Sequence, residues 1–375
     1  MDNPFSRLFG FGKADLSQTK GSIAALDIGS SSIKVIQLRK EKGRAILETY
    51  GELATGPYVG MAIGQSVNLA ADKIVEITKD LFTEASVTTK SIVMSIPLRS
   101  SLLMALELPR LNDAELSDVV PLEARKYVPV PISEVLLDWW VIPEREDASP
   151  VYDDQNKTGR KGVEVLVAAI HRDTAKLYED VAQRLGVMMD FFEIETFSAI
   201  RSVMRNDLSA TAIVDLGAGT TKVAIVDYGV VRISHTINKG SQDITTALAR
   251  SLNVSFAKAE EIKRQVGLVE QISEAGEVQP IISPIVEYIF SEVDRVIINY
   301  QKKYTRSVDK IILIGGGVQL KGLYDLAKKS IDIPVQIGTP FDKVETPAFM
   351  ENVLREAGPS FAVAIGLSLR ELQDL

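Results

Sequence analysis

The sequence has no cysteine and only two histidines, His171 and His235, which lie far apart in the chain. Disulfides and thiolate zinc sites are therefore excluded, and two isolated histidines cannot form a His-rich metal cluster. Long hydrophobic runs are also missing, because no apolar stretch approaches the ~18 residues that a membrane-spanning helix needs. The N-terminus has no signal-peptide core either. We therefore expect a soluble or membrane-peripheral protein of the reducing cytoplasm.

Positive charge is scarce. The 42 Lys and Arg residues are outnumbered by 50 Asp and Glu residues, which gives a net charge of -8. A general nucleic-acid surface needs clustered Lys and Arg to neutralise phosphates, so nucleic acid is not an expected partner. A chain of 375 residues, 46% of them hydrophobic, is ordinary globular material. It is long enough for about two to four domains.

A short segment that occurs twice organises the chain. The first copy runs from Ala25 to Val35 and the second from Val214 to Val223, and they align without a gap. The matched positions share one offset: Asp27 with Asp215, Gly29 with Gly217, Ser32 with Thr220, Lys34 with Lys222, and Val35 with Val223. Each copy lies between runs rich in Ile and Val, which predicts a strand, a tight polar turn and a second strand. The repeat therefore predicts two related α/β lobes.

The residue types of this hairpin indicate phosphate binding. Glycine lets the backbone approach a ligand closely, while turn N–H groups and Ser or Thr hydroxyls form an anion-binding concavity. An Asp at the end of each first strand offers hard oxygens to Mg²⁺, so Asp27 and Asp215 are the candidate metal ligands. One copy alone is more often a plain surface turn, but two gapless copies favour a shared polyphosphate. The candidate binding residues are Asp27, Gly29, Ser30, Ser31, Ser32 and Lys34 in the first copy, and Asp215, Gly217, Gly219, Thr220, Thr221 and Lys222 in the second.

Hydrophobic periodicity predicts the remaining elements. The first lobe should contain three strands between 21 and 53, a helix at 68–85 and a strand at 91–96. A compact α+β insert follows at 98–187, with strands at 102–108, 135–142 and 163–170 and helices at 113–127 and 174–185. A strand at 189–194 then leads into a helix near 196. The second lobe should contain strands at 212–216, 222–227 and 230–237, helices at 240–252, 255–266 and 284–304, and a buried strand from 310 that enters a triple-glycine turn. A helix at 358–371 closes the chain.

Two local features have competing interpretations. A short apolar cluster near the N-terminus consists of Phe5, Leu8, Phe9 and Phe11. It could contact a membrane or a partner, but we favour the interpretation that it belongs to a frayed terminus. The neighbours Trp139 and Trp140 should point to opposite faces of their strand. An exposed Trp would be a partner site, but packing under a neighbouring element is favoured.

These features together resemble the actin-like ATPase superfamily over about residues 21 to 371. The resemblance implies an α/β, actin-like (ribonuclease H-like) two-lobe ATPase fold with a small α+β insert in the first lobe. It also implies ATP and Mg²⁺ as cofactors, with residues 27–34 and 215–222 as the two phosphate loops. The implied adenosine turn is Gly315, Gly316, Gly317 and Val318, with Gly240 also at the nucleotide. Glu195 matches the connecting-helix acid, the candidate catalytic residue, and Glu260 and Lys263 match a nucleoside-binding pair of bacterial actins.

Two residues depart from the superfamily pattern. Thr196 stands where relatives usually place Pro, and Ser241 follows Gly240 where a second Gly is common. Because the local motif of Glu195 departs in this way, slow hydrolysis or none is expected.

The position of the insert resembles FtsA and especially the PilM family of type IV pilus assembly. The segments 106–111 and 123–129 look specifically PilM-like, and the chain stops at Leu375 where FtsA would continue into a membrane helix. The resemblance implies an ATP-binding cytoplasmic scaffold that docks the tail of a PilN-like inner-membrane protein in a groove of the insert and contacts other pilus assembly proteins. The implied division is a tail at 1–20, first-lobe core at 21–97, 188–208 and 356–375, insert at 98–187, second-lobe core at 209–238 and 307–355, and a second-lobe subdomain at 239–306.

Three other functions remain open at the level of sequence. FtsA-like cell-division proteins share the superfamily, as do sugar or acetate kinases and chaperone ATPases. A kinase needs an acceptor base near the γ-phosphate, and no additional acidic motif stands out. A chaperone would carry a further substrate domain. Cytoskeletal filaments generally use the small-subdomain position that this insert replaces or relocates, so simple polymers are less expected.

Overall fold

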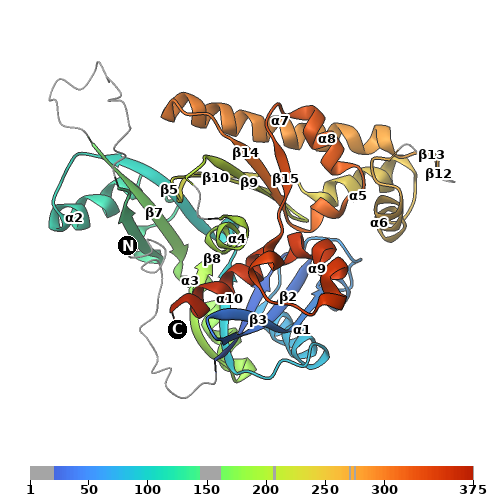
Figure 1. Cartoon of the computed structure of the whole chain (residues 1–375), viewed down its shortest axis with the longest axis horizontal. Helices are drawn as coiled ribbons and strands as arrows, with labels where there is room; N and C mark the ends of the chain where they lie inside the picture. The colour runs from blue at the N-terminus through green and yellow to red at the C-terminus, as the bar shows by residue number, and fades with distance from the viewer. Residues whose placement is uncertain (1–20, 144–161, 206–207, 270–271, 274–275, 375) are drawn as a thin grey trace.

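Two five-stranded sheets of the same topology form the centres of two lobes (Figure 1). The structure is a computed structural model that describes residues 21–143, 162–205, 208–269, 272–273 and 276–374. The predicted N-terminal tail and nearly all of the predicted polar loop at 144–162 therefore lie outside the described residues. None of the described helices is long and apolar enough to cross a membrane.

The first sheet has the order β3-β2-β1-β4-β8, and the second has the order β11-β10-β9-β14-β15. In each sheet a three-stranded antiparallel meander is extended by two parallel strands. The strands of the first sheet are β1 (Ser22–Ile28), β2 (Ser32–Glu41), β3 (Arg44–Ala54), β4 (Ser91–Ile96) and β8 (Met188–Ile194). Those of the second are β9 (Thr211–Leu216), β10 (Thr221–Asp227), β11 (Val230–Ile237), β14 (Lys310–Ile314) and β15 (Val335–Ile337). The predicted duplication is thus confirmed at the level of topology.

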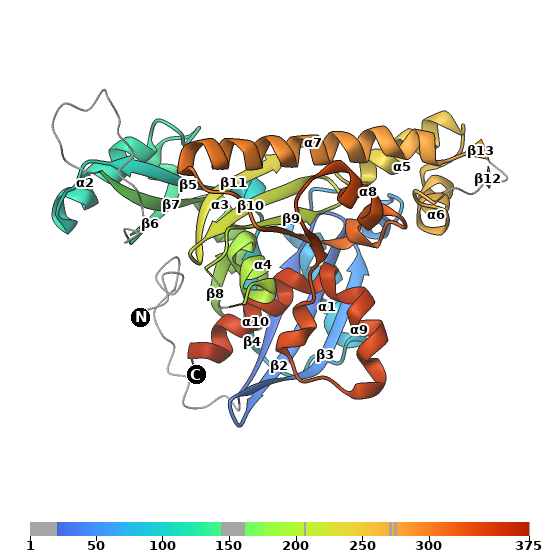
Figure 2. The same cartoon turned by 45° about the horizontal axis from the view of Figure 1, so that its top comes forward.

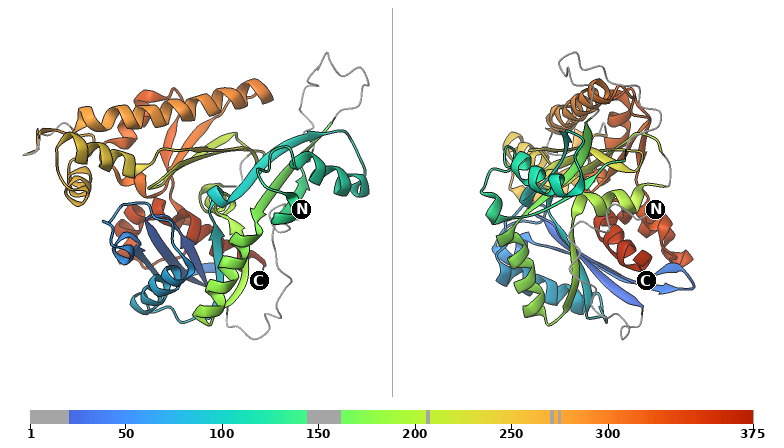
Figure 3. Two further views of the ribbon diagram at one scale, coloured as in Figure 1. Left: turned by 180° about the vertical axis from the view of Figure 1, so that it is seen from behind. Right: turned by 90° about the vertical axis from the view of Figure 1, so that its left-hand side faces the viewer.

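Helices cover both faces of the first sheet. Strand β4 is buried along its whole length, as expected for a parallel strand covered on two sides. Figure 3 (right) shows α1 (Ala71–Glu84) and α3 (Arg172–Leu185) on one side and α10 (Ala362–Asp374) on the other. Helix α10 lies directly on α4 (Glu195–Val203), and a Cβ built at Gly366 would be only 1.7 Å from the Ser198 carbonyl oxygen. Glycine at position 366 therefore permits the close packing of these two helices.

The insert is a three-stranded antiparallel sheet of order β5-β7-β6 with one helix packed on it. Its elements are β5 (Ser101–Leu108), α2 (Asp113–Ala124), β6 (Val135–Val141) and β7 (Val163–His171). A capping box of Asn112 and Glu115 starts α2, because each side chain accepts from the other residue's backbone N–H. The helix ends at Ala124, three residues before its predicted end and ahead of Pro129.

The two tryptophans of β6 are both half-buried and pack in different clusters. Trp139 packs against the core between the insert sheet and α2, and Trp140 packs against the core of the first lobe. The expectation of opposite faces and of packing under neighbouring elements is therefore confirmed.

The second lobe has its own hydrophobic core under a long helix. Its helices are α5 (Ser241–Ser251), α6 (Phe256–Gln265), α7 (Gln279–Tyr304) and α8 (Leu323–Ser330), with a short hairpin of β12 (Ile272–Ser273) and β13 (Gly276–Glu277) before α7. Helix α9 (Glu351–Ala357) precedes α10. The predicted start of the long helix at Pro284 is wrong, since α7 begins five residues earlier with Pro280 in its first turn.

The insert reaches across to the second lobe. Figure 2 shows the C-terminal end of α7 above the insert strands, and Lys303 Nζ lies 3.2 Å from Glu107 Oε1 there. Glu164 of β7 accepts hydrogen bonds from Arg232 of β11 and from the hydroxyl of Tyr304. The insert thus contacts both lobes, which leaves β6 as the edge strand of its sheet on the side away from β5.

Candidate functional site

Both copies of the repeated hairpin line one cleft of about 660 Å³ between the lobes. The predicted residues that line it are Asp27, Gly29, Ser30, Ser31, Ser32, Lys34, Glu195, Asp215, Gly217, Gly219, Thr220, Lys222, Glu260, Lys263, Gly315, Gly316 and Gly317. The cleft has the volume of a small-molecule site, and polar groups converge on it from both sides.

The structure does not bring three predicted residues to the cleft wall. Thr221 is buried and its hydroxyl donates to the Lys239 carbonyl at 2.9 Å. A Cβ built at Gly240 would lie 2.4 Å from the Ala218 carbonyl oxygen, so this glycine supports the second loop from behind. Val318 is buried in the core of the second lobe.

The two turns are built alike. A Cβ built at Gly29 would lie 2.8 Å from the Ser32 carbonyl oxygen, and one at Gly217 would lie 2.8 Å from that of Thr220. Glycine is therefore required at both positions to let the turn close. The strands that flank each turn also pair in the same register, with Asp27 opposite Lys34 and Asp215 opposite Lys222.

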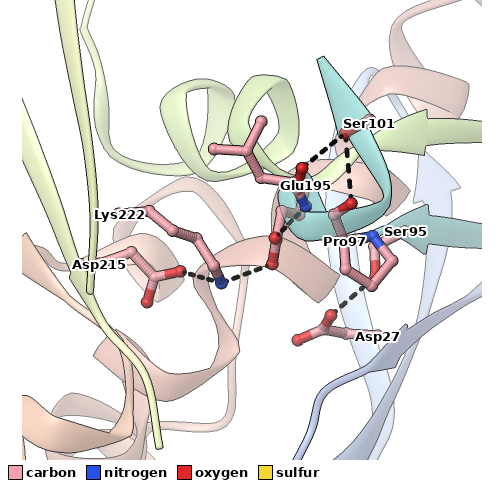
Figure 4. A network of polar contacts seen from close by, with 8 residues as sticks. Asp27, Ser95, Pro97, Ser101, Glu195, Asp215 and Lys222 are labelled. Carbon is pink, nitrogen blue, oxygen red and sulfur yellow. Dashed lines mark hydrogen bonds and ion pairs between the residues drawn. The ribbon is translucent and has the colours of Figure 1, made fainter. Parts of the chain in front are cut away.

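Glu195, the first residue of α4, lies at the junction of three segments (Figure 4). Its Oε1 accepts from the Leu98 backbone N–H at 2.5 Å, and its Oε2 accepts from Lys222 Nζ at 2.7 Å. Lys222 Nζ also lies 3.1 Å from Asp215 Oδ2. Burial raises the pKa of Glu195 although Lys222 opposes that shift. Burial alone would lower the pKa of Lys222, but Asp215 and Glu195 hold it above its ordinary value.

The first-lobe charges have different partners. Ser95 Oγ donates to Asp27 Oδ1 at 2.7 Å, and burial raises the pKa of Asp27 although Lys34 and this hydrogen bond oppose the shift. Lys34 Nζ donates to Ser32 Oγ at 2.8 Å and lies 3.3 Å from Glu52 Oε1.

The predicted nucleoside pair is a buried ion pair on one face of α6. Lys263 Nζ lies 2.6 Å from Glu260 Oε2, as the spacing of three residues predicts. The Thr245 hydroxyl donates to the same oxygen at 2.7 Å, and Arg264 Nε lies 2.8 Å from Oε1. The hydroxyl of Ser255 caps this helix by accepting from the Lys258 N–H.

The triple-glycine turn follows β14 and closes against the second loop. Gly315 has a φ of +89°, and a Cβ built on it would lie 2.3 Å from Asp215 Oδ1. Both the backbone conformation and the space therefore require glycine. The Gly315 N–H donates to the Pro359 carbonyl at 2.8 Å, which ties the turn to the segment before α10.

A protein-family model described as type IV pilus assembly protein PilM matches residues 25–372. The chain belongs to the PilM family. The solved PilM-PilN type IV pilus biogenesis complex is similar in fold, with a TM-score of 0.77 and 23% sequence identity over 94% of this chain and 99% of that one. MreB5 of Spiroplasma citri bound to ADP gives a TM-score of 0.51 at 11% identity over 94% of this chain and 97% of that chain. The predicted actin-like fold is therefore confirmed.

Curated relatives of this PilM-family chain include cell division proteins. FtsA of Pseudomonas aeruginosa is 25% identical, and the match covers 95% of this chain and 90% of FtsA. FtsA of Streptococcus pneumoniae is 22% identical, with coverage of 93% and 80%. Because the matching family model is that of PilM, FtsA marks a related branch of the fold.

Sequence reasoning missed several residues that complete the site of this PilM-family chain. Glu52 lies directly opposite Lys34 on β3, so strand pairing could have found it. The loop before α1 has no periodic signal, yet its Ser66 N–H donates to Gln242 Oε1 of the second lobe at 2.9 Å. A Cβ built at Gly64 would lie 2.8 Å from the Glu260 carboxyl carbon. This loop therefore spans the cleft from lobe to lobe.

The residues present fit a metal that is held mainly by phosphates. Among the described residues, no group of three or more His, Cys, Asp or Glu side chains could hold a metal ion. Mg²⁺ usually keeps several waters and takes one or two carboxylates besides substrate phosphates. Asp27 and Asp215, which face the cleft from both lobes, supply such carboxylates.

Proposed function

We propose that this chain binds Mg-ATP in the cleft and acts as a cytoplasmic scaffold that docks the tail of a PilN-like inner-membrane protein. The observation that carries the nucleotide assignment is the pair of equal phosphate turns facing one cleft beside a glycine turn. Backbone N–H groups and hydroxyls of both loops would hold the phosphates, and the buried pair on α6 would lie at the nucleoside. When bound, Mg²⁺ would neutralise phosphate charge between the two aspartates.

Isothermal titration calorimetry tests the nucleotide site. Purified, nucleotide-free protein should bind ATP in the presence of Mg²⁺, and Gly217→Val should abolish the binding because its side chain meets the Thr220 carbonyl. Glu351→Gln, at an exposed ion pair outside the cleft, is the control for handling and folding. No heat of binding at millimolar ATP would refute the assignment.

Slow turnover is part of the proposal. Positioning of the attacking water supplies much of the acceleration in phosphoryl transfer. Glu195 would be the carboxylate for that work, but its oxygens already accept from Leu98 and Lys222. A turnover of many per second that Glu195→Ala abolishes would make this protein an enzyme instead of a scaffold.

The partner assignment rests on family membership and on the insert. The solved relative contains PilN, and the insert here offers β6 as an edge strand, with β5 lying against the second lobe. An extended peptide binds such an edge through backbone hydrogen bonds. The tail would then hold this acidic chain at the inner face of the membrane, where other pilus assembly proteins could meet it.

Hydrogen exchange with a synthetic tail peptide tests the docking site. The expected result is protection of the amides of β6 (Val135–Val141) when the peptide is added, with β3 (Arg44–Ala54), the edge strand of the first sheet, as the internal reference. Because the insert contacts both lobes, ATP should change the affinity for the peptide, and the peptide must change the affinity for ATP by the same factor. Protection confined to β3 or to the second lobe would place the tail elsewhere.

A further inference from the structure

The lysines of the two phosphate hairpins hold different partners. Lys222 Nζ lies between two carboxylates, 2.7 Å from Glu195 Oε2 and 3.1 Å from Asp215 Oδ2 (Figure 4). Lys34, its counterpart, donates to Ser32 and pairs with Glu52. Equal motifs in equal registers thus place an ammonium group in two different electrostatic surroundings.

The third strand of each meander explains the difference. Lys34 lies directly opposite Glu52 of β3, whereas Lys222 lies directly opposite Thr236 of β11. Residues directly opposite on antiparallel strands share a face and have Cβ atoms about 5 Å apart. Lys34 therefore finds a carboxylate beside it, while Lys222 finds a hydroxyl and extends to the carboxylates of the cleft.

Lys222 completes the restraint on Glu195. The Glu195 side chain is nearly buried, and each of its oxygens accepts a hydrogen bond, one from the Leu98 N–H and one from Lys222. The ammonium group also offsets part of its negative charge, which it shares with Asp215. A carboxylate held in this way is not free to orient and accept a proton from water, because both its direction and its charge are already committed.

On the basis of the proposed nucleotide site, we infer that Lys222 is a positioning residue. It restrains Glu195 and offsets the charge of Asp215, so the cleft binds ATP with little dependence on Mg²⁺. The ammonium group supplies positive charge at the place where a metal would otherwise compensate Asp215. Without it, ATP would enter a cleft in which the carboxylates of Asp215 and Glu195 have lost the cation that they share. Mg²⁺ would then be needed to offset the repulsion.

The test compares ATP affinity in Mg²⁺ with ATP affinity in EDTA, measured by calorimetry. Thr236→Glu gives Lys222 the cross-strand carboxylate that Lys34 has, and Thr236→Gln is the neutral control of similar size. We expect the Mg²⁺-to-EDTA affinity ratio to rise about tenfold in Thr236→Glu, since one lost charge contact is worth about one decade. Thr236→Gln should leave the ratio unchanged. Single-turnover hydrolysis should rise in Thr236→Glu as Glu195 is released.

Lys222→Met removes the charge at similar volume and should raise the same ratio. Thermal melting would show whether this variant folds. If it does not fold, the affinity ratio of Thr236→Glu still tests the inference. An unchanged ratio in Thr236→Glu, with ATP still bound, overturns the inference and leaves the proposed function standing. Loss of ATP binding by folded Lys222→Met in both media also overturns it, because Lys222 would then bind phosphate. If the unsubstituted chain binds no ATP, the proposed function itself fails.

Discussion

The two lobes share strand order and hairpin register, yet they bury their charges in different places. The first lobe buries a cluster beneath its sheet, where Glu193 at the end of β8 meets Arg201 and Arg370 at 2.7 and 2.9 Å. In the second lobe, Lys222 lies at the cleft, where it meets Asp215 and also Glu195 from the first lobe. Duplication has preserved the backbone, while the neighbours of each copy determine what its charged side chains do.

Removing the buried charge of the first lobe should have the largest effect. Glu193→Gln removes the buried charge with which Arg201 and Arg370 both pair, so we expect a loss of about 3–5 kcal/mol in the free energy of unfolding. Chemical denaturation measures the change. Glu351→Gln, which breaks the exposed pair with Arg355, is the control and should stay within about 0.5 kcal/mol. A loss below 1 kcal/mol in Glu193→Gln would show that the cluster does not hold the lobe together.

The ion pairs of Glu193 also make the stability of the protein depend on pH. Burial alone would raise the pKa of Glu193, but Arg201 and Arg370 hold it below its ordinary value. Since the folded pKa is lower than the unfolded one, this stability is fully present above the unfolded pKa and is lost as pH falls through the folded pKa. Acid unfolding of the Gln variant should therefore be less steep over that range.

Helix packing offers a second contrast between the lobes. In the first lobe, Gly366 brings α10 against the backbone of α4, whereas a Cβ built at Gly316 in the second lobe has nothing within 4 Å. Gly366→Ala should cost about 1–3 kcal/mol in the free energy of unfolding, because the two helices must separate. Thermal or chemical unfolding measures it, with Gly316→Ala as the comparison. Equal stability of both variants would contradict the close contact.

The two aspartates should contribute unequally to Mg-ATP binding. Asp27 accepts from the neutral Ser95 hydroxyl, while the charge of Asp215 is compensated by Lys222. Asp27→Asn should therefore weaken Mg-ATP binding by about 2 kcal/mol and Asp215→Asn by about 1 kcal/mol or less. Calorimetry at constant Mg²⁺ measures both. A larger effect of Asp215→Asn would mean that Lys222 leaves this aspartate when the nucleotide binds.

The repeat in the sequence was enough to predict the two lobes, the hairpins and the shared cleft, because these depend on local pattern and strand pairing. The direction in which each side chain points was harder to predict from the sequence. Thr221 stands between Thr220 and Lys222 in the motif, yet neighbours on a strand point to opposite faces, so it turns away from the cleft. A contiguous motif therefore overstates the number of residues that face a ligand.

The partners of the two lysines lay beyond the reach of a motif. Lys34 and Lys222 occupy equal positions in the motif, but their carboxylate partners lie outside it. Glu52 is a cross-strand neighbour of Lys34, whereas only the tertiary fold brings Glu195 to Lys222. The loop around Ser66 was missed for the same reason. Its contact with Gln242 joins residues 176 positions apart without any periodic pattern.

The smallest expected change converts the first hairpin into a copy of the second. Glu52→Thr places opposite Lys34 the residue type that lies opposite Lys222, so Lys34 should turn from the rim toward Asp27. The Glu52 side chain is 42% exposed, so the lost pair should change the free energy of unfolding by only about 0.2–1 kcal/mol. The Mg²⁺-to-EDTA affinity ratio for ATP should nevertheless fall, because a second aspartate would gain an internal cation. Glu52→Gln, which removes the charge but keeps the side chain length, should act in the same direction. A rise in the ratio would show that Lys34 and Lys222 are not governed by their cross-strand neighbours.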